Sequence, residues 1–159
     1  MTGFLHRPPT PLPSQSDFDP FEGDLDAQSA WRTFGGLSLA DAYAKFLQVP
    51  ERYQEDFMFM GSRAFAYYFP VVDRYLRTVS LTPDDLGDCE AAILGSDIAY
   101  QLNPKLAPFS ADLLSEIESL HAFVIQNIHR YTATPDDRKN ILRTWTHVAE
   151  AIRQCRCIE

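Results

Sequence analysis

An all-α fold, a compact multi-helix bundle of about six or seven helices, is the prediction for this chain of 159 residues. Apolar residues in its longer segments recur at three- and four-residue spacing, which places them on one side of a helix. Serine, threonine and proline stand at positions where helices commonly begin. No segment of comparable length alternates between apolar and polar residues as a half-buried strand does, so the sequence predicts helices throughout.

The predicted helices follow one another from residue 24 to the C-terminal end. Gly35 and Gly36 separate the first two helices, and Pro50 begins the third. The sequences Thr82-Pro83-Asp84-Asp85 and Thr134-Pro135-Asp136-Asp137 each combine a capping hydroxyl, a proline at the first helical position and carboxylates at the positive helix end. With Ser62 and Ser110 as further caps, these signals predict helices over residues 24–34, 38–48, 51–60, 63–79, 82–102, 110–131 and 134–155.

The predicted helix over residues 63–79 has the widest apolar side, covering roughly 200° of its circumference. A surface helix shows a narrower stripe, so we expect this helix to be central and enclosed on more than one side. Pro70 falls on the remaining polar arc, among Arg63, Arg74 and Arg77. There, a missing backbone donor should bend the helix without filling the core.

Residues 1–22 are predicted to be a disordered, proline-rich tail, and residues 23–159 a single helical domain. The tail contains five prolines and little apolar periodicity. It lacks the hydrophobic run of a signal peptide, and the longest apolar stretch of the chain, residues 64–72, is far shorter than the roughly 20 residues that cross a bilayer. These features predict a cytoplasmic protein that is not bound to a membrane.

Few residues have the spacing of a catalytic or metal site. Glu118 and His121 are three residues apart, as in di-iron helical bundles, but a second copy of this pair is missing. His121 lies within the apolar arc of its own helix, so we expect a hydrogen-bonded core histidine, whereas His147 should be solvated. Cys155 and Cys157 lack the partners of a four-ligand zinc site. We therefore predict no metal, no cofactor and no catalytic residue.

Aromatic residues are dense between Tyr53 and Tyr75. Core packing is the favoured interpretation of this density. The alternative is a pocket for a small apolar ligand, or an enzymatic site, in which Tyr67 and Tyr68 act with His121.

The acidic residues are unevenly distributed. The chain has a net charge of −8; residues 1–26 hold one basic and five acidic groups, and residues 81–119 hold one basic and eight acidic groups. An acidic face repels nucleic acid and speeds association with a basic protein surface, although it also serves solubility. The candidate partner-binding residues are Asp84, Asp85, Asp88, Glu90, Asp97, Asp112, Glu116 and Glu118.

The run from Lys45 to Leu76 contains the sequence Ala64-Phe65-Ala66-Tyr67-Tyr68-Phe69-Pro70. This run resembles a pattern in small uncharacterised bacterial all-helical proteins, which have an Ala-Phe-x-Tyr-Tyr-x-Pro core. Some proteins of that kind are thought to be immunity proteins that neutralise a secreted toxin. The resemblance implies a bacterial origin and carries no catalytic residue.

Together, these observations favour a non-enzymatic interaction protein that binds a basic protein partner through an acidic face. The resemblance implies that this protein is immunity-like. The partner would be neither nucleic acid nor membrane. The alternative is a small-ligand-binding or enzymatic helical domain that uses the aromatic region and His121. A deep polar cleft would favour the alternative, and an acidic convex face would favour the interaction protein.

Overall fold

The computed structural model describes residues 11–79, 90–103 and 109–157, and this part of the chain is helical without a strand. The all-α prediction is therefore confirmed. The helices are α1 (Gln15–Phe18), α2 (Leu25–Phe34), α3 (Leu39–Gln48), α4 (Pro50–Tyr53), α5 (Asp56–Phe59), α6 (Ser62–Thr78), α7 (Glu90–Gln101), α8 (Ala111–Gln126), the 3-10 helix η2 (Ile128–Arg130) and α9 (Pro135–Arg156).

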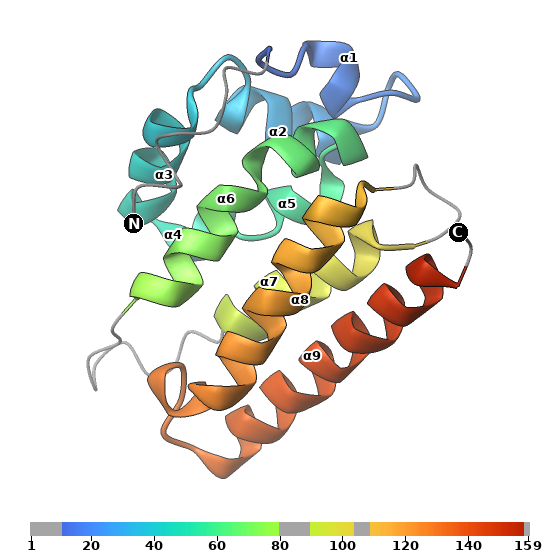
Figure 1. Ribbon diagram of the computed structural model, residues 1–159. Helices are drawn as coiled ribbons and strands as arrows, with labels where there is room; N and C mark the ends of the chain where they lie inside the picture. Colours follow the sequence, from blue (N-terminus) through green and yellow to red (C-terminus); the bar gives the residue numbers. More distant parts are fainter. Residues whose placement is uncertain (1–10, 80–89, 104–108, 158–159) are drawn as a thin grey trace.

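Helix α6 occupies the centre of the bundle, as its wide apolar side predicts. It packs against α1 and α3 on one side and against α7 and α8 on the other (Figure 1). The short helices α1 to α5 form one end of the molecule, and the long helix α9 lies along α7 and α8 (Figure 1). Because α6 has neighbours on several sides, the expected solvent exposure of Pro70 is wrong, and this residue is buried.

Two predicted helices have different boundaries in the structure. Residues 51–60 form two four-residue helices, α4 and α5, in place of one longer helix. The Gln101 side chain donates hydrogen bonds to the carbonyls of Phe57 and Met60, at 2.9 and 2.7 Å, and so satisfies backbone groups that a continuing helix would use itself. The helix predicted to reach residue 131 ends at Gln126, where Asn127 caps it with both backbone and side-chain donors. The predicted start at Thr82 lies outside the described residues.

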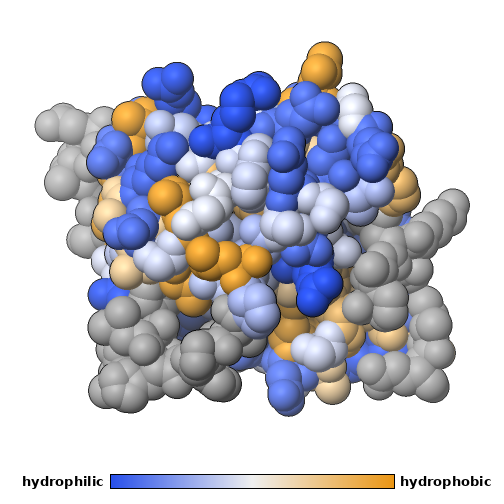
Figure 2. Space-filling view, turned by 90° about the horizontal axis from the view of Figure 1, so that it is seen from above, coloured by the Kyte–Doolittle hydropathy of each residue, from blue (hydrophilic) through white to orange (hydrophobic). Residues whose placement is uncertain are grey.

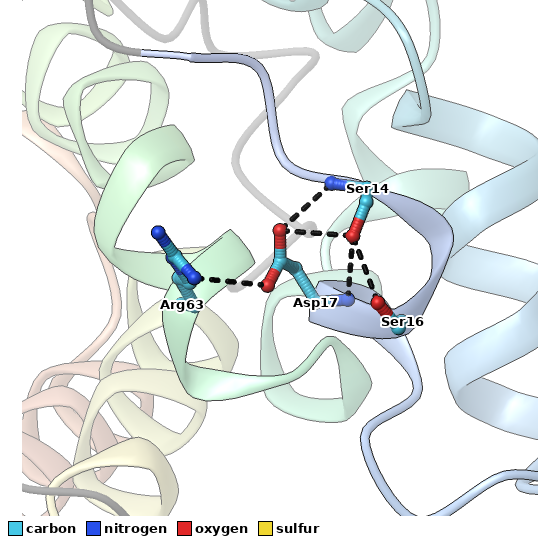
Figure 3. Close-up of polar contacts among 4 residues, drawn as sticks. All are labelled: Ser14, Ser16, Asp17 and Arg63. Carbon is cyan, nitrogen blue, oxygen red and sulfur yellow. Dashed lines mark hydrogen bonds and ion pairs between the residues drawn. The ribbon is translucent and has the colours of Figure 1, made fainter.

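The prediction of a disordered tail is wrong for the segment around α1. Ser14 and Asp17 form a capping box, and Asp17 also pairs with Arg63 of α6, with 3.6 Å between Oδ1 and Nη1 (Figure 3). Phe18 has no exposed surface and packs against Trp31 and Tyr68, with ring centroids 5.3 and 5.8 Å away. One buried aromatic side chain thus orders a segment whose composition is typical of a tail. Residues 1–10 lie outside the described residues.

A membrane-crossing helix needs length and hydrophobicity together, and none of the helices in the described ranges has both. The longest of them, α9, carries several charged residues along its length.

Candidate functional site

Three of the predicted partner-binding carboxylates lie on the exposed side of α8. Asp112, Glu116 and Glu118 are all exposed, while the opposite side of the helix is buried against α6 and α9. At 100° per residue the three fall within an arc of roughly 160°. Ser110 begins the helix by accepting a hydrogen bond from the Leu113 backbone at 3.2 Å, which fixes this orientation from the first turn. We call these three residues the acidic face of α8.

Arginine side chains border the acidic face of α8. Arg156 of α9 lies 2.6 Å from Glu118, and the exposed fractions of the two side chains are 43% and 53%. Arg77 of α6 donates to the Ser119 hydroxyl at 3.1 Å and is itself paired with Asp73 at 3.0 Å. The acidic face therefore carries less net negative charge than the sequence predicts, because Arg156 partly neutralises Glu118 in the folded chain.

Asp97 is not on this face, which corrects its prediction as a partner-binding residue. Its side chain has no exposed surface, because α7 packs between α5 and α9. Both carboxylate oxygens lack a hydrogen-bond partner among the described residues. The side chains of the remaining predicted partner-binding residues, Asp84, Asp85, Asp88 and Glu90, lie outside the described part of the structure.

Burial of Asp97 changes its ionisation. Desolvation raises the pKa of Asp97 well above its usual range, and the carboxylates Glu55 and Asp56 raise it further. Asp56 is affected in the same direction: burial raises its pKa to about 6, against a lowering hydrogen bond from Thr33. The sequence contains a signal for this burial, since Asp97 lies on the side of α7 that carries Leu94, Ile98 and Gln101, all of which are buried.

The alternative ligand or enzymatic site of Tyr67, Tyr68 and His121 is not formed, because the tyrosines and the histidine have different neighbours. Tyr68 is buried beside Phe18 and Phe34, and its hydroxyl lies 2.9 and 2.7 Å from the carbonyl oxygens of Phe34 and Leu37. Tyr67, beside it, is half-buried. His121 lies in another part of the bundle, 6.3 Å from the Trp145 ring of α9.

The two histidines of α8 and α9 differ in exposure. His121 is half-buried, and burial lowers its pKa, while the neighbouring carboxylate of Glu118 and a hydrogen bond with the Trp145 backbone raise it. His121 thus lies at the edge of the core and is less buried than the core histidine that was predicted. His147 is exposed, as predicted.

The aromatic residues between Tyr53 and Tyr75 mainly fill the core, which confirms the favoured interpretation of their density. Phe57, Phe65 and Phe69 are buried. The ring of Phe57 packs against Phe34 and Phe46, with centroids 5.3 and 5.5 Å away. These rings pack directly against one another, as side chains do in close-packed protein interiors.

The C-terminal cysteines are separate free thiols. Cys155 is half-buried with its sulfur 3.0 Å from the Leu102 carbonyl oxygen, and burial raises the pKa of its thiol, whereas Cys157 is exposed. Within the described ranges, no three His, Cys, Asp or Glu side chains are grouped closely enough to hold a metal ion.

A polar groove of about 490 Å³ lies between α7 and α9. Arg143 in this groove donates to the Asn140 side chain at 2.7 Å. No pattern in the sequence indicates this groove, because its polar residues come from two helices that are distant in the chain. Its lining consists of Ala92, Ile93, Ser96, Asn140, Arg143, Thr144 and His147.

Comparisons with known proteins give no identification. The chain matches no protein-family model, and neither curated proteins nor solved structures give a significant match. The resemblance of residues 45–76 to bacterial helical proteins therefore stays a prediction, and the interpretation of function rests on the residues and contacts described above.

Proposed function

We propose that this chain is a non-enzymatic interaction protein that binds a basic protein partner through the acidic face of α8. The observation that carries the proposal is the exposure of Asp112, Glu116 and Glu118 on one side of a helix whose other side is buried. A surface of this kind steers a basic partner toward the complex through its long-range field. An immunity-like role, in which the partner is a basic toxin, is the specific form of this proposal.

The surroundings of the aromatic residues support binding over catalysis. The Tyr68 hydroxyl is engaged by two backbone carbonyls, and His121 lies in a different part of the bundle. A catalytic site needs convergent polar groups within reach of one substrate atom, and these residues do not converge.

A charge-reversal experiment tests the proposal. Asp112→Lys combined with Glu116→Lys should leave the fold intact, because exposed carboxylates contribute little to stability and the helix-dipole interaction of Asp112 is worth about 0.3–1 kcal/mol. The partner is first isolated from a lysate of the source organism at low salt, and association rates are then measured by surface plasmon resonance. We expect the double variant to associate more slowly and added salt to slow the wild type.

A matched control uses acidic residues on another part of the surface. Asp41 is exposed in the first turn of α3, as Asp112 is in α8, and Glu51 is exposed in α4. Asp41→Lys combined with Glu51→Lys changes the net charge by the same amount. Equal slowing by both double variants would mean that net charge, and not the acidic face of α8, attracts the partner.

A second candidate function, the binding of a small anion, is favoured by the groove between α7 and α9. Arg143 and His147 lie one helical turn apart, and none of the described residues that line the groove is a carboxylate. Titration with inorganic phosphate, followed through the His147 ring signals by NMR, should show saturable shifts that Arg143→Ala removes. Shifts that do not saturate, or that persist in Arg143→Ala, would reject this candidate.

A further inference from the structure

The turn between α1 and α2 exposes two large apolar side chains to solvent. Phe21 is 83% exposed and Leu25 is 76% exposed, more than any of the other large hydrophobic residues that reach the surface of the described chain. We call residues 19–26 the Phe21 loop. Figure 2 looks onto the end of the molecule that carries α1 and α2, where hydrophobic side chains lie among hydrophilic ones. Exposed apolar surface rimmed by polar residues is typical of protein–protein interaction sites.

Hydrogen bonds fix the conformation of the Phe21 loop. The Asp19 carboxylate accepts a bond from the Gly23 backbone at 2.8 Å, across the residues that present Phe21. Gly23 has a φ of 98°, a left-handed conformation that glycine adopts without steric cost. Asp24 then caps α2 by accepting from the backbone of Asp26 and Ala27, at 2.9 and 3.2 Å. Both ends of the turn are therefore closed by side-chain oxygens.

The Phe21 loop is also anchored to the core. Phe18, just before it, is fully buried, and its carbonyl accepts a bond from the Gly61 backbone at 2.8 Å. Gly61 approaches the backbone of Asp17 so closely that a side chain at position 61 would collide with it. The loop is consequently preorganised, which lowers the entropic cost of using it in a complex.

Negative charge surrounds the two apolar side chains. Glu22, Asp24 and Asp26 are exposed, and residues 17–26 contain five acidic groups and no basic group. Arg63 offsets only Asp17 within this segment. Two like-charged loops facing each other would repel, and an anionic membrane would repel the same carboxylates, so neither a second copy of this chain nor a lipid surface fits.

We propose that the Phe21 loop is a docking surface for a basic protein partner, in which Phe21 and Leu25 enter an apolar recess rimmed by lysine or arginine side chains. This inference rests on the proposed function, because it assigns a contact region to the same class of partner. An exposed aromatic side chain on a rigid loop is the type of residue that contributes most to protein–protein affinity. The acidic residues around it determine the class of partner and the association rate.

A random 12-residue peptide library displayed on phage, panned against the immobilised full chain, tests the inference with a defined probe. We expect enriched peptides in which lysine or arginine flanks an aromatic or aliphatic residue. The most enriched peptide is then synthesised with a fluorescent label, and its affinity is measured by anisotropy at two salt concentrations. Phe21→Ala should weaken binding by roughly tenfold or more, and Leu25→Ala should act in the same direction.

Two further variants make the outcome specific. Tyr100→Ala removes an aromatic side chain that is 51% exposed on α7, and it should leave peptide binding unchanged. Glu22→Gln combined with Asp26→Asn should weaken binding mainly at low salt. Thermal melting of each variant checks that the fold is intact. Peptides without basic residues, no enrichment, or equal binding to Phe21→Ala would each overturn the inference.

The acidic face of α8 separates this inference from the proposed function. If Asp112→Lys with Glu116→Lys abolishes binding of the basic peptide while Phe21→Ala does not, the docking surface is on α8 and the Phe21 loop is not involved. If both sets of variants bind the peptide as the wild type does, both proposals fail. Loss of binding in Phe21→Ala with retention in the α8 variant supports the Phe21 loop as the docking surface.

Discussion

The two ends of the bundle reach a helical structure by different means. On one side of α6, helices α1 to α5 have 4, 10, 10, 4 and 4 residues, and on the other side α7, α8 and α9 have 12, 16 and 22. Isolated helices shorter than about 12 residues are marginal in water. The short helices therefore depend on tertiary contacts to a degree that the long helices do not.

Aromatic rings supply those contacts at the short-helix end. Phe34 packs against Tyr53, Phe57 and Tyr68, with ring centroids 5.3 to 6.2 Å apart. Side-chain donors also reach the backbone there, as when the Lys45 ammonium donates to the Thr33 carbonyl at 2.8 Å. Large side chains can therefore stabilise helices of one turn, because each ring buries area against several neighbours at once.

Aliphatic residues dominate the long-helix end, with one indole at its centre. Trp145 is fully buried and donates from Nε1 to the Ala91 carbonyl at 2.8 Å. Leu113, Ile117 and Leu120 of α8 are buried along one side of the helix. Their spacing follows the periodicity of the sequence, so this end was easier to predict.

The largest effect expected at the short-helix end is that of Phe18→Ala. Loss of burial and the remaining cavity should lower the free energy of unfolding by about 3–5 kcal/mol. Phe21→Ala, three residues away but exposed, should change it by less than about 0.5 kcal/mol. Urea unfolding measures both variants. Equal stabilities for the two would show that α1 does not contribute to the fold.

At the long-helix end, Gly95→Ala tests how closely α7 approaches α9. A methyl group there would lie 2.7 Å from Trp145 Nε1 and 2.9 Å from a methyl of Thr144. We expect a loss of roughly 1–3 kcal/mol from overpacking, in spite of the better helix propensity of alanine. Ser96→Ala, at the exposed neighbouring position, is the control for thermal unfolding and should be nearly neutral. A stabilised Gly95→Ala variant would contradict the close approach.

Tyr68→Phe tests whether side-chain oxygens hold the short helices. The change leaves the ring in place but removes the hydroxyl that lies beside the Phe34 and Leu37 carbonyls. Leaving a buried acceptor unpaired costs about 1–3 kcal/mol, which chemical unfolding detects. Tyr67→Phe at the half-buried neighbour should have little effect. A neutral Tyr68→Phe would mean that packing alone is sufficient.

The contact between α5 and α7 joins the two ends and should depend on pH. The unfolded chain releases the Asp97 proton near pH 4, whereas burial raises the pKa of Asp97 in the folded chain, so the free energy of unfolding falls as the pH rises above about 4. The slope is at most about 1.4 kcal/mol per pH unit for one proton. Asp56 adds to this slope until about pH 6, where its folded form also ionises.

Asp97→Asn should therefore match the wild type near pH 4.5 and be more stable at pH 7 to 8. Urea unfolding across this range measures the difference, with Asp112→Asn as an exposed control that should leave the slope nearly unchanged. A wild-type stability that does not fall between pH 4.5 and 7 would contradict a neutral, buried Asp97.

The smallest effect is expected at the border of the acidic face of α8. Arg156→Ala removes the partner of Glu118 from a pair that is about half exposed, so the free energy of unfolding should change by less than about 1 kcal/mol. The association rate of a basic partner should rise, because Glu118 becomes fully available. An unchanged or slower association would remove Glu118 from the proposed interface.

The helical class, the central position of α6 and most helix boundaries follow from local patterns in the sequence. Ser38, Ser110 and Thr134 cap α3, α8 and α9 through local hydrogen bonds that depend only on nearby residues. The apolar periodicity of α6 and α8 is equally local. Local signals are readable without knowledge of the rest of the chain, because their energetic terms act within a few residues.

In the proline-containing, acidic stretch around α1, burial depends instead on the tertiary structure. Phe18 and Phe21 stand three residues apart in one proline-containing, acidic stretch, but Phe18 meets Trp31 and Tyr68 whereas Phe21 faces solvent. The position of Asp97 on the apolar side of α7 favours its burial, but the packing of α5 and α9 determines that it is covered completely. Burial depends on neighbours that are distant in the chain, and a local pattern contains no information about where those neighbours pack.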